Sequence, residues 1–287
     1  MENCQIKLND NRTLRYAEYG TKKGYPIIYC HGSQSSRLEM HYDLAFAFKK
    51  NIKIISIDRP GHGESDFNPS GTIRSFANDV DQLVDKLGIG RFSVVGMSAG
   101  APFAMGIAHY LNQRTDKLGI VSGFAPLDAE SQKALTKDVR LLLKIAKSFP
   151  IFLKMLLKMQ NWQLKRNPNL ALSNFLRIMS SEDQDILKNE RVLGVIKTMF
   201  IEAFKNGSQG VAYEISRILV QDWGFEMKEI KAVSFIWHGK KDNNVPLEWA
   251  IKTNNEIGNS KLKIYPSQGH LIFFENAEEI FTKMLAN

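Results

Sequence analysis

A serine that could act as a nucleophile stands at position 98, inside the run RFSVVGMSAGAPFAM. Gly96-Met97-Ser98-Ala99-Gly100 has the pattern G-x-S-x-G, and it joins an apolar strand-like run to a helix-like run. Glycines at both ends would let strand and helix approach closely around a strained turn from which the serine oxygen projects. A serine hydroxyl becomes an effective nucleophile when a base takes its proton. The pattern therefore predicts a nucleophilic serine served by a histidine elsewhere in the chain.

A base and an acid for this serine follow near the end of the chain. His270 stands in LKIYPSQGHLIFFE, where a β-rich run breaks before a helix-like end, so we expect it on a loop. Asp242 stands in AVSFIWHGKKDNNVP, just past a strongly apolar run and before a proline that can open a helix. Asp128, soon after the strand-like KLGIVSGFAP, is an alternative acid, but WHGKKDNNVP carries the fuller motif. The order Ser98, Asp242, His270 belongs to the α/β-hydrolase fold and differs from the chymotrypsin and subtilisin orders.

Further segments resemble the α/β-hydrolase superfamily, over nearly the whole chain outside a central insert. PIIYCHGSQSSR is similar to its oxyanion-loop segment, and IISIDRPGHGES to a strand-and-turn block of its lid-bearing members. WHGKKDNNVP and SQGH are similar to its acid and histidine loops. Within the superfamily, the chain looks most like bacterial esterase-like serine hydrolases with a helical cap. This resemblance implies the reaction machinery and leaves the metabolite open.

The resemblance also implies where a reaction oxyanion would bind. One backbone N–H donor would be Ala99, directly after the nucleophile. The other would come from the loop after His31-Gly32, with Ser33 as first choice and Gln34 as second. His31 is expected to hold this loop by a hydrogen bond. Because the loop differs from the HGGG form of some lipases and esterases, the second donor stays open.

Other polar residues are expected to have structural roles. Asp58, Arg59 and His62 in DRPGHGES match a block that shapes the turn beside the site in the family. The remaining histidines lack partners at ligand spacing, so no metal site is predicted, and the proposed chemistry needs no cofactor. Of two cysteines, Cys30 ends an apolar strand and fits a buried thiol in a reducing compartment. The N-terminal residues lack a basic start followed by an apolar stretch, so a cytoplasmic location is expected.

Short apolar strands alternate with helix-like stretches along this chain of 287 residues. Residues 4–19 predict two antiparallel strands, and six further strands follow: PIIYC, IKIISI, FSVVGM, KLGIVSG, AVSFIWH and LKIYP. The alternation predicts an α/β fold with a mostly parallel central sheet flanked by helices. Ligands bind such sheets beyond the carboxyl ends of the strands, where Ser98, Asp242 and His270 all fall.

Between residues 127 and 222 this alternation stops, and the sequence is helix-like throughout. We expect a hydrolase core of residues 1–126 and 223–287 and a helical cap insertion of residues 127–222. Residues 131–180 hold ten basic residues and one acidic residue, a net charge of +9, whereas the whole chain carries +8. The remaining residues therefore sum to nearly zero, and the positive charge is concentrated in the insertion.

The stretch VRLLLKIAKSFPIFLKMLLKMQNW interleaves lysines with apolar residues at helical spacing, which rules out a transmembrane span. In one interpretation, residues 141–160 form an apolar wall over the pocket while their lysines are solvated. In the other, the stretch is a lid that makes weak contact with an anionic membrane. Nucleic-acid binding is not expected, because no recognised binding module accompanies the basic stretch.

Taken together, these residues predict a serine hydrolase that cleaves an ester or similarly activated acyl compound. His270 would be the general base, Asp242 would support the imidazolium, and backbone N–H groups of the two oxyanion donors would stabilise the intermediate. A cofactor-free perhydrolase and an amidase or peptidase would use the same triad. A ligand-binding protein that keeps the fold without turnover is a hypothesis of a different class. The expected partner is a small-molecule acyl substrate.

Overall fold

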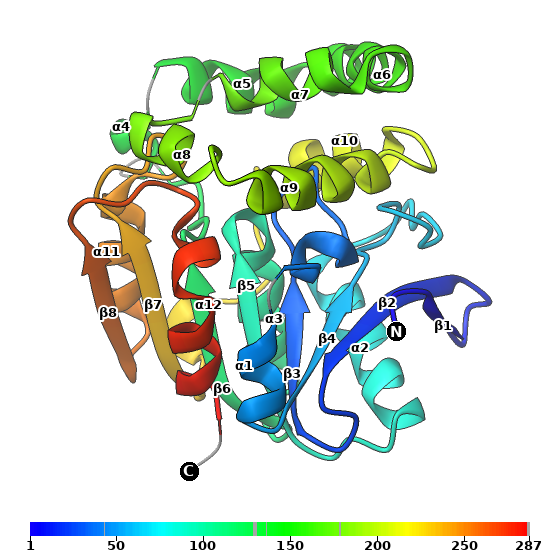
Figure 1. Ribbon diagram of the computed structural model, residues 1–287, viewed down its shortest axis with the longest axis vertical. Coiled ribbons are helices and arrows are strands. Elements are labelled where there is room, and N and C mark those ends of the chain that lie inside the picture. Colours follow the sequence, from blue (N-terminus) through cyan, green and yellow to red (C-terminus); the bar gives the residue numbers. More distant parts are fainter. Residues whose placement is uncertain (43, 129–130, 136, 178, 286–287) are drawn as a thin grey trace.

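An eight-stranded, mostly parallel sheet forms the centre of the molecule (Figure 1). The structure is a computed structural model that describes residues 1–42, 44–128, 131–135, 137–177 and 179–285. The strand order is β1-β2-β4-β3-β5-β6-β7-β8. As predicted for residues 4–19, β1 (Cys4–Lys7) and β2 (Thr13–Gly20) are antiparallel, and β2 is also antiparallel to β4. The parallel strands are β3 (Tyr25–Cys30), β4 (Ile52–Ile57), β5 (Phe92–Met97), β6 (Thr115–Val121), β7 (Val233–Gly239) and β8 (Ser260–Tyr265).

Helices cover the sheet, which explains why its central strands are apolar almost throughout. β5 is buried along its whole length, as expected of a parallel strand packed on both faces. One face carries α1 (Ala45–Lys49) beside α12 (Ile272–Lys283), and the other carries α2 (Ile73–Lys86) beside α3 (Ala101–Tyr110). A further helix, α11 (Leu247–Glu256), packs on β7 and β8. The predicted α/β architecture is therefore confirmed.

Between β6 and β7, the described residues form helices and no strand. Residues 131–219 constitute what we term the helical segment: α4 (Ser131–Ala134), α5 (Lys137–Ser148), α6 (Pro150–Arg166), α7 (Pro168–Leu176), α8 (Ser181–Ile186), α9 (Glu190–Ala203), α10 (Gln209–Tyr213) and the π-helix η3 (Glu214–Leu219). Figure 1 shows it over the carboxyl ends of the parallel strands, with α8, α9 and α10 next to the sheet and α5, α6 and α7 outermost. No helix in the described part of the chain is long and apolar enough to cross a membrane.

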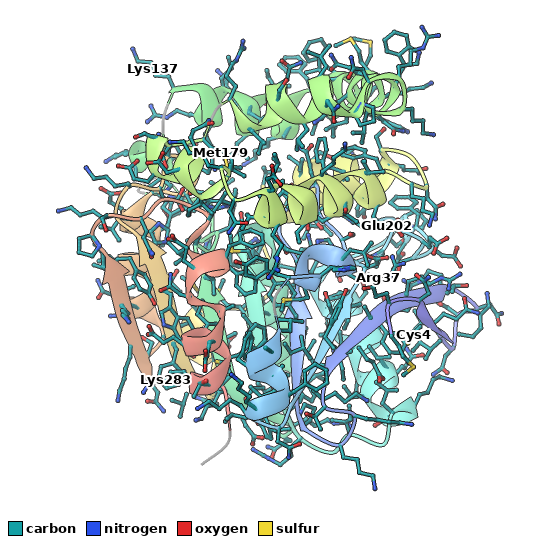
Figure 2. All side chains as sticks on the ribbon, in the orientation of Figure 1. Cys4, Arg37, Lys137, Met179, Glu202 and Lys283 are labelled. Carbon is teal, nitrogen blue, oxygen red and sulfur yellow. The ribbon has the colours of Figure 1, made fainter. Side chains whose placement is uncertain are left out.

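Buried ion pairs attach the helical segment to the sheet layer. Arg37 belongs to the short helix η1 (Arg37–Met40) and is 1% exposed. Its Nη1 lies 2.6 Å from Asp58 Oδ2 and 2.8 Å from Oε1 of Glu202 in α9, at the border seen in Figure 2. Removing one member of a buried pair leaves an uncompensated charge, so such links resist separation. The segment is therefore fixed on the sheet by charge as well as by apolar packing.

Candidate active site

Ser98 occupies the turn between β5 and α3, and its backbone is strained as the G-x-S-x-G pattern predicts. Its φ is 51°, in the left-handed region that residues other than glycine rarely adopt. The flanking glycines allow the close approach: a Cβ on Gly96 would lie 2.6 Å from Gly100 O, and one on Gly100 would lie 2.1 Å from Cys30 O. Ser98 is 8% exposed and lines a cavity. The geometry thus presents its side chain at a sharp turn beside a space for ligand.

The structure also brings Asp242 and His270 together. His270 Nδ1 lies 2.8 Å from Asp242 Oδ2, and Asp242 Oδ1 accepts hydrogen bonds from the N–H groups of Asn244 and Val245 at 2.8 and 2.9 Å. Burial opposes the charge of Asp242, but His270 and the surrounding hydrogen bonds hold the pKa of this carboxyl below its ordinary value. Burial likewise opposes protonation of His270, yet the Asp242 carboxylate raises the pKa of the imidazole above its ordinary value. This pair can accept a proton and stabilise the resulting charge.

The alternative acid, Asp128, contacts other groups. Its carboxylate lies 2.8 Å from Lys252 Nζ and accepts a hydrogen bond from Ser131 N at 2.8 Å. Although burial opposes the change, these partners lower the pKa of Asp128 to about 2. At the end of β7, His238 Nε2 donates to Val245 O at 2.9 Å and braces the loop that carries Asp242. Of the two candidate acids, Asp242 is the one in contact with His270.

The loop after β3 is held by hydrogen bonds that leave the Ser33 N–H available. Gly32 N donates to Glu39 Oε2 at 2.9 Å, while Gly32 O accepts from His31 Nδ1 at 2.8 Å and from Arg59 Nη2 at 3.0 Å. A trans peptide points its C=O and N–H in opposite directions, so these bonds direct the Ser33 N–H away from Arg59. Within the described chain, this N–H has no protein acceptor, and Ser33 lines the same cavity as Ser98.

The other two residues predicted for the oxyanion site also lie beside Ser98. Ala99 follows the nucleophile in the first turn of a helix, where N–H groups lack intrahelical acceptors. A Cβ on Gly32 would lie only 3.7 Å from Ser98 Cβ, so the loop adjoins the serine. Gln34 has a φ of 52°, lines the cavity and accepts a hydrogen bond from Gln160 Nε2 of α6 at 2.8 Å.

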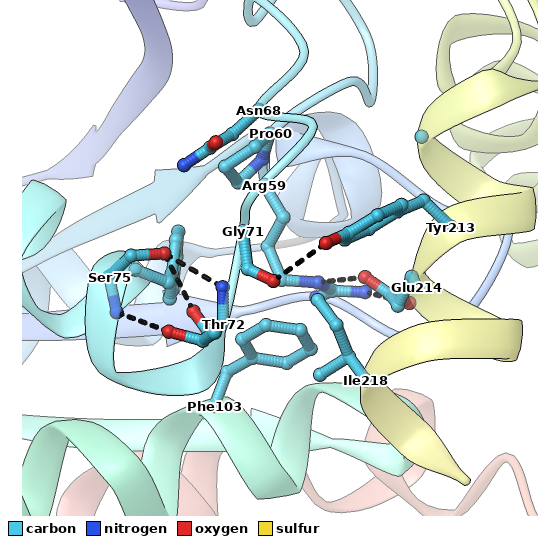
Figure 3. Close-up of a pocket in the computed structure, with 12 residues that line it drawn as sticks. Arg59, Pro60, Asn68, Gly71, Thr72, Ser75, Phe103, Tyr213, Glu214 and Ile218 are labelled. Carbon is cyan, nitrogen blue, oxygen red and sulfur yellow. Dashed lines mark hydrogen bonds and ion pairs between the residues drawn. The ribbon is translucent and has the colours of Figure 1, made fainter. Parts of the chain in front are cut away.

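Arg59 connects this loop to the helical segment, and Figure 3 shows its ion pair with Glu214. Its guanidinium donates to His31 O and Gly32 O and forms a two-point ion pair with Glu214 of η3, with distances of 2.6 and 2.9 Å. It also lies 4.7 Å from the ring centroid of Phe103. The hollow drawn in Figure 3, about 20 Å³ in volume, has room for roughly one water molecule. None of the three candidate catalytic side chains lines it. Arg59 therefore has the structural role expected from its sequence.

A carboxylate of the helical segment holds the loop that carries the histidine. Asp183 in α8 accepts hydrogen bonds from His270 N at 3.0 Å and Leu271 N at 2.7 Å, and from Ser180 Oγ at 2.8 Å. Asp183 is fully buried, and a Cβ on Gly269 would lie 2.4 Å from Ser180 Oγ. The sequence analysis did not identify Asp183. The spacing Ser180-x-x-Asp183 marks a helix start, but it carries no signal of a contact with the distant histidine loop.

A second carboxyl group missed by the sequence analysis lies on the cavity wall. Glu39 is 4% exposed, and its Oε2 accepts hydrogen bonds from Tyr29 Oη at 3.1 Å and Gly32 N at 2.9 Å. Burial raises the pKa of Glu39 to about 7, against the lowering effect of these hydrogen bonds. Protonated and ionised forms therefore coexist near neutral pH beside the predicted oxyanion loop.

The cavity shared by Ser98 and His270 has a volume of about 190 Å³ and is mostly apolar. Its apolar wall comes from both the sheet layer and the helical segment: Met97, Phe124, Val139, Leu142, Leu143, Met179, Ile196, Met199, Ile215, Leu219 and Leu271. From the stretch 141–160, only two residues of α5 belong to this wall. The expectation that the whole stretch covers the pocket is therefore wrong for α6. Several of its large apolar side chains are exposed instead.

The chain belongs to the α/β-hydrolase fold family, whose model matches residues 25–277. It is 24% identical to the non-heme chloroperoxidase of Burkholderia pyrrocinia over 293 residues, covering 98% of both chains. It is also 24% identical to the bifunctional esterase/perhydrolase DCH of Acinetobacter calcoaceticus over 287 residues, again covering 98% of both. An esterase from Exiguobacterium antarcticum has a similar structure, with a TM-score of 0.71 at 20% identity over 98% of this chain and 97% of that one. At that identity, the structural likeness shows the fold alone.

Proposed function

We propose that the protein is a serine hydrolase that cleaves an ester or a similarly activated acyl compound. One observation carries this proposal: a strained Ser98 and the His270 of a buried His–Asp pair line the same apolar cavity. A solvent-shielded nucleophile beside a supported base is the arrangement that acyl transfer requires. The printed names of similar proteins, an esterase and an esterase/perhydrolase, agree with this chemistry.

In the proposed reaction, His270 Nε2 takes the Ser98 proton while Oγ attacks the substrate carbonyl. Asp242 keeps the proton on His270 Nδ1 and stabilises the imidazolium, with which it already shares a 2.8 Å contact. The bond to the leaving alcohol then breaks, and the imidazolium gives the alcohol its proton. Water, deprotonated by the same histidine, attacks the acyl-enzyme, releases the acid and restores Ser98.

The oxyanion of each tetrahedral intermediate is assigned to the N–H groups of Ala99 and Ser33. Ser33 is preferred over Gln34 because the hydrogen bonds on Gly32 O fix the orientation of the peptide that carries the Ser33 N–H. Glu39 accepts a hydrogen bond from Gly32 N, and Arg59 donates one to Gly32 O. Both side chains therefore hold this loop in place and are positioning residues.

We further propose that residues 127–222 act as a cap on a hydrolase core made of residues 1–126 and 223–287. The cap would close a cavity somewhat larger than the roughly 150 Å³ in which benzene binds an engineered apolar site. A phenyl ester or a short to medium acyl chain therefore fits as the small-molecule substrate. Cys4 and Cys30 are free thiols, which supports a cytoplasmic location because disulfides persist in oxidising compartments.

Labelling with a fluorophosphonate and hydrolysis of p-nitrophenyl esters test this function together. Wild type should be labelled at Ser98, and Ser98→Ala should lose labelling and at least about a thousandfold in kcat with an unchanged melting temperature. Ser70→Ala, at an exposed loop position, is the control and should behave as wild type. More than a tenth of wild-type activity in Ser98→Ala would refute the assignment. An unlabelled wild type that binds ligand tightly would identify a non-catalytic binding protein instead.

Perhydrolysis is a second candidate activity, favoured by the likeness to the esterase/perhydrolase DCH. Here hydrogen peroxide replaces water as the attacking nucleophile, so the acyl-enzyme yields a peracid and free Ser98. Incubating an acetate ester and peroxide with the enzyme should produce peracid that Ser98→Ala does not produce. The same preparation assayed on anilides would reveal an amidase or peptidase, which would need the same triad.

A further inference from the structure

The outermost helix of the molecule carries apolar side chains on two opposite faces. Leu153, Leu157 and Leu164 of α6 are buried against the rest of the helical segment. Ile151, Met155, Met159 and Trp162, spaced i, i+4, i+8 and i+11, form a stripe that faces away. The exposed fractions of these four residues run from 56% to 84%. Figure 1 places α6 in the layer farthest from the sheet. We term this stripe, with the half-exposed Phe152 beside it, the α6 outer face.

This concentration of exposed apolar side chains is unusual for a surface helix. Of fourteen large apolar residues exposed in the described chain, eight lie between Leu141 and Trp162. Single exposed apolar residues are ordinary, but a contiguous patch indicates a surface that binds another apolar surface. The α6 outer face therefore requires a partner that can accept inserted side chains.

The charge around this face specifies the kind of partner. Residues 139–181 contain no Asp or Glu, and their basic residues are Arg140, Lys144, Lys147, Lys154, Lys158, Lys165, Arg166 and Arg177. Lys154, Lys158 and Lys165 are exposed along α6, and Arg166 lies over the Trp162 ring at 4.5 Å. These three lysines have no acidic partner among the described residues, so their charge is available to an external anion.

We propose that the α6 outer face docks on an anionic lipid surface. An apolar stripe bordered by lysines matches a bilayer interface, where side chains enter the acyl boundary and cations meet phosphate headgroups. A second copy of this chain fits poorly, because a symmetric contact would bring two acid-free basic faces together. Nucleic acid offers phosphates but no apolar layer to receive the stripe.

Docking through α6 would also bring a lipid surface close to the catalytic cavity. Gln160, on the inward side of α6, donates to Gln34 Oε1 at 2.8 Å, and Gln34 lines the cavity. A substrate that partitions into a membrane would therefore be concentrated within a helix diameter of the site. This functional consequence rests on the proposed hydrolase activity, whereas the docking itself does not.

Cosedimentation with vesicles tests the docking without reference to catalysis. Wild type should bind phosphatidylglycerol vesicles at 50 mM NaCl, bind phosphatidylcholine vesicles weakly, and lose affinity as salt screens the lysines. Lys154→Gln/Lys158→Gln should lower the partition coefficient by roughly 25-fold, from about fivefold per lysine at the surface. Met155→Gln/Met159→Gln should also weaken vesicle binding. This loss should persist at high salt, because salt does not screen the insertion of apolar side chains. Each variant should keep its melting temperature, since the substituted residues are exposed.

Lys22→Gln/Lys23→Gln is the matched control, because it removes the same charge from exposed positions between β2 and β3. It should bind vesicles as wild type does. The proposal is overturned if wild type does not bind anionic vesicles, if the control loses as much affinity as the lysine variant, or if light scattering shows a dimer that Met155→Gln/Met159→Gln disrupts. Hydrolysis of a small soluble ester by the α6 variants separates failure of docking from failure of the proposed function.

Discussion

Replacement of Asp183 by Asn isolates the contact through which the helical segment holds the candidate base. The carboxylate accepts one hydrogen bond from His270 N and one from Leu271 N, on different oxygens, in a fully buried site. Asparagine keeps one acceptor oxygen and presents an NH₂ group in place of the other. Whichever way the amide faces, one backbone N–H then meets a donor, so one charge-assisted hydrogen bond is lost.

Loss of such a bond costs about 1.5–3 kcal/mol. If the cost appears in the placement of the imidazole, kcat/KM falls by about 10- to 150-fold, since about 1.4 kcal/mol corresponds to tenfold in rate. The substitution also removes a negative charge near His270. Burial opposes protonation of this histidine, and the Asp183 charge adds to Asp242 in raising its pKa. Asp183→Asn should therefore lower the pKa of His270 and move the acid limb of the kcat/KM profile to lower pH.

The assay is hydrolysis of p-nitrophenyl acetate between pH 5.5 and 9, with thermal unfolding measured in the same buffers. Asp185→Asn is the control, because this exposed residue of the same helix forms an ion pair with the exposed Lys188 and, among the described residues, with no other group, so it should change kcat/KM less than twofold. Ser180→Ala removes the Oγ that donates to Asp183 Oδ2 and accepts from Asp183 N, but it keeps both backbone donors of the histidine loop, so it should have an intermediate effect. An Asp183→Asn enzyme within twofold of wild type, with the same acid limb, would refute the positioning role.

Two further perturbations test other parts of the site. Asp242→Asn should lower kcat by about 10³- to 10⁴-fold. Asp128→Asn should change kcat less than about threefold, because the Asp128 carboxylate contacts Lys252 and Ser131 and has no contact with His270 among the described residues. Steady-state kinetics that rank the two variants the other way would assign the catalytic acid to Asp128. Burial raises the pKa of Glu39 to about 7 from an ordinary 4.5, so the native state keeps a proton that the unfolded chain loses in this window. The free energy of unfolding should then fall as pH rises from 4.5 to 7, by up to about 1.4 kcal/mol per unit. Glu39→Gln, which mimics the neutral carboxyl, should show a shallower fall than wild type, because buried Asp58, whose pKa is raised to about 6, still contributes; parallel denaturation profiles for the two proteins would contradict the shift.

The residues of this site that could be predicted from sequence are those whose role depends on their immediate neighbours in the chain. A left-handed serine between glycines leaves a five-residue signature, because the glycines are needed where strand and helix nearly touch. His270 and Asp242 each follow an apolar run that becomes a strand, and parallel strands place their carboxyl ends on one edge. The mostly parallel sheet and the hairpin at residues 4–19 could also be predicted, because strands and helices alternate along the chain.

Two of the residues that sequence reasoning missed, Asp183 and Glu214, act across long separations in the chain. Asp183 contacts a loop 87 residues further on, and Glu214 pairs with Arg59 across 155 residues. Neither contact leaves a local pattern, because any buried acid at a helix start looks like a cap. The prediction that residues 141–160 cover the pocket was wrong for another reason. The apolar residues of this stretch lie on both sides of α6, and a single face was expected because one apolar stripe is the usual requirement of a surface helix.

These long-range contacts bear on how the proposed cap relates to catalysis. Arg59 carries the link from Glu214 in η3 to the carbonyls of the oxyanion loop, and Asp183 in α8 fixes the backbone of His270. Gln160 in α6 reaches the same oxyanion loop at Gln34. The groups proposed for proton transfer and for oxyanion stabilisation are thus positioned by residues of the sheet layer and of the helical segment together. Because each link is a directed hydrogen bond or ion pair, a displacement of the helical segment would disturb the base and the oxyanion donors before it exposed the cavity. The segment is accordingly a structural component of the candidate active site, and exchanging it for that of a relative would alter rate as well as substrate preference.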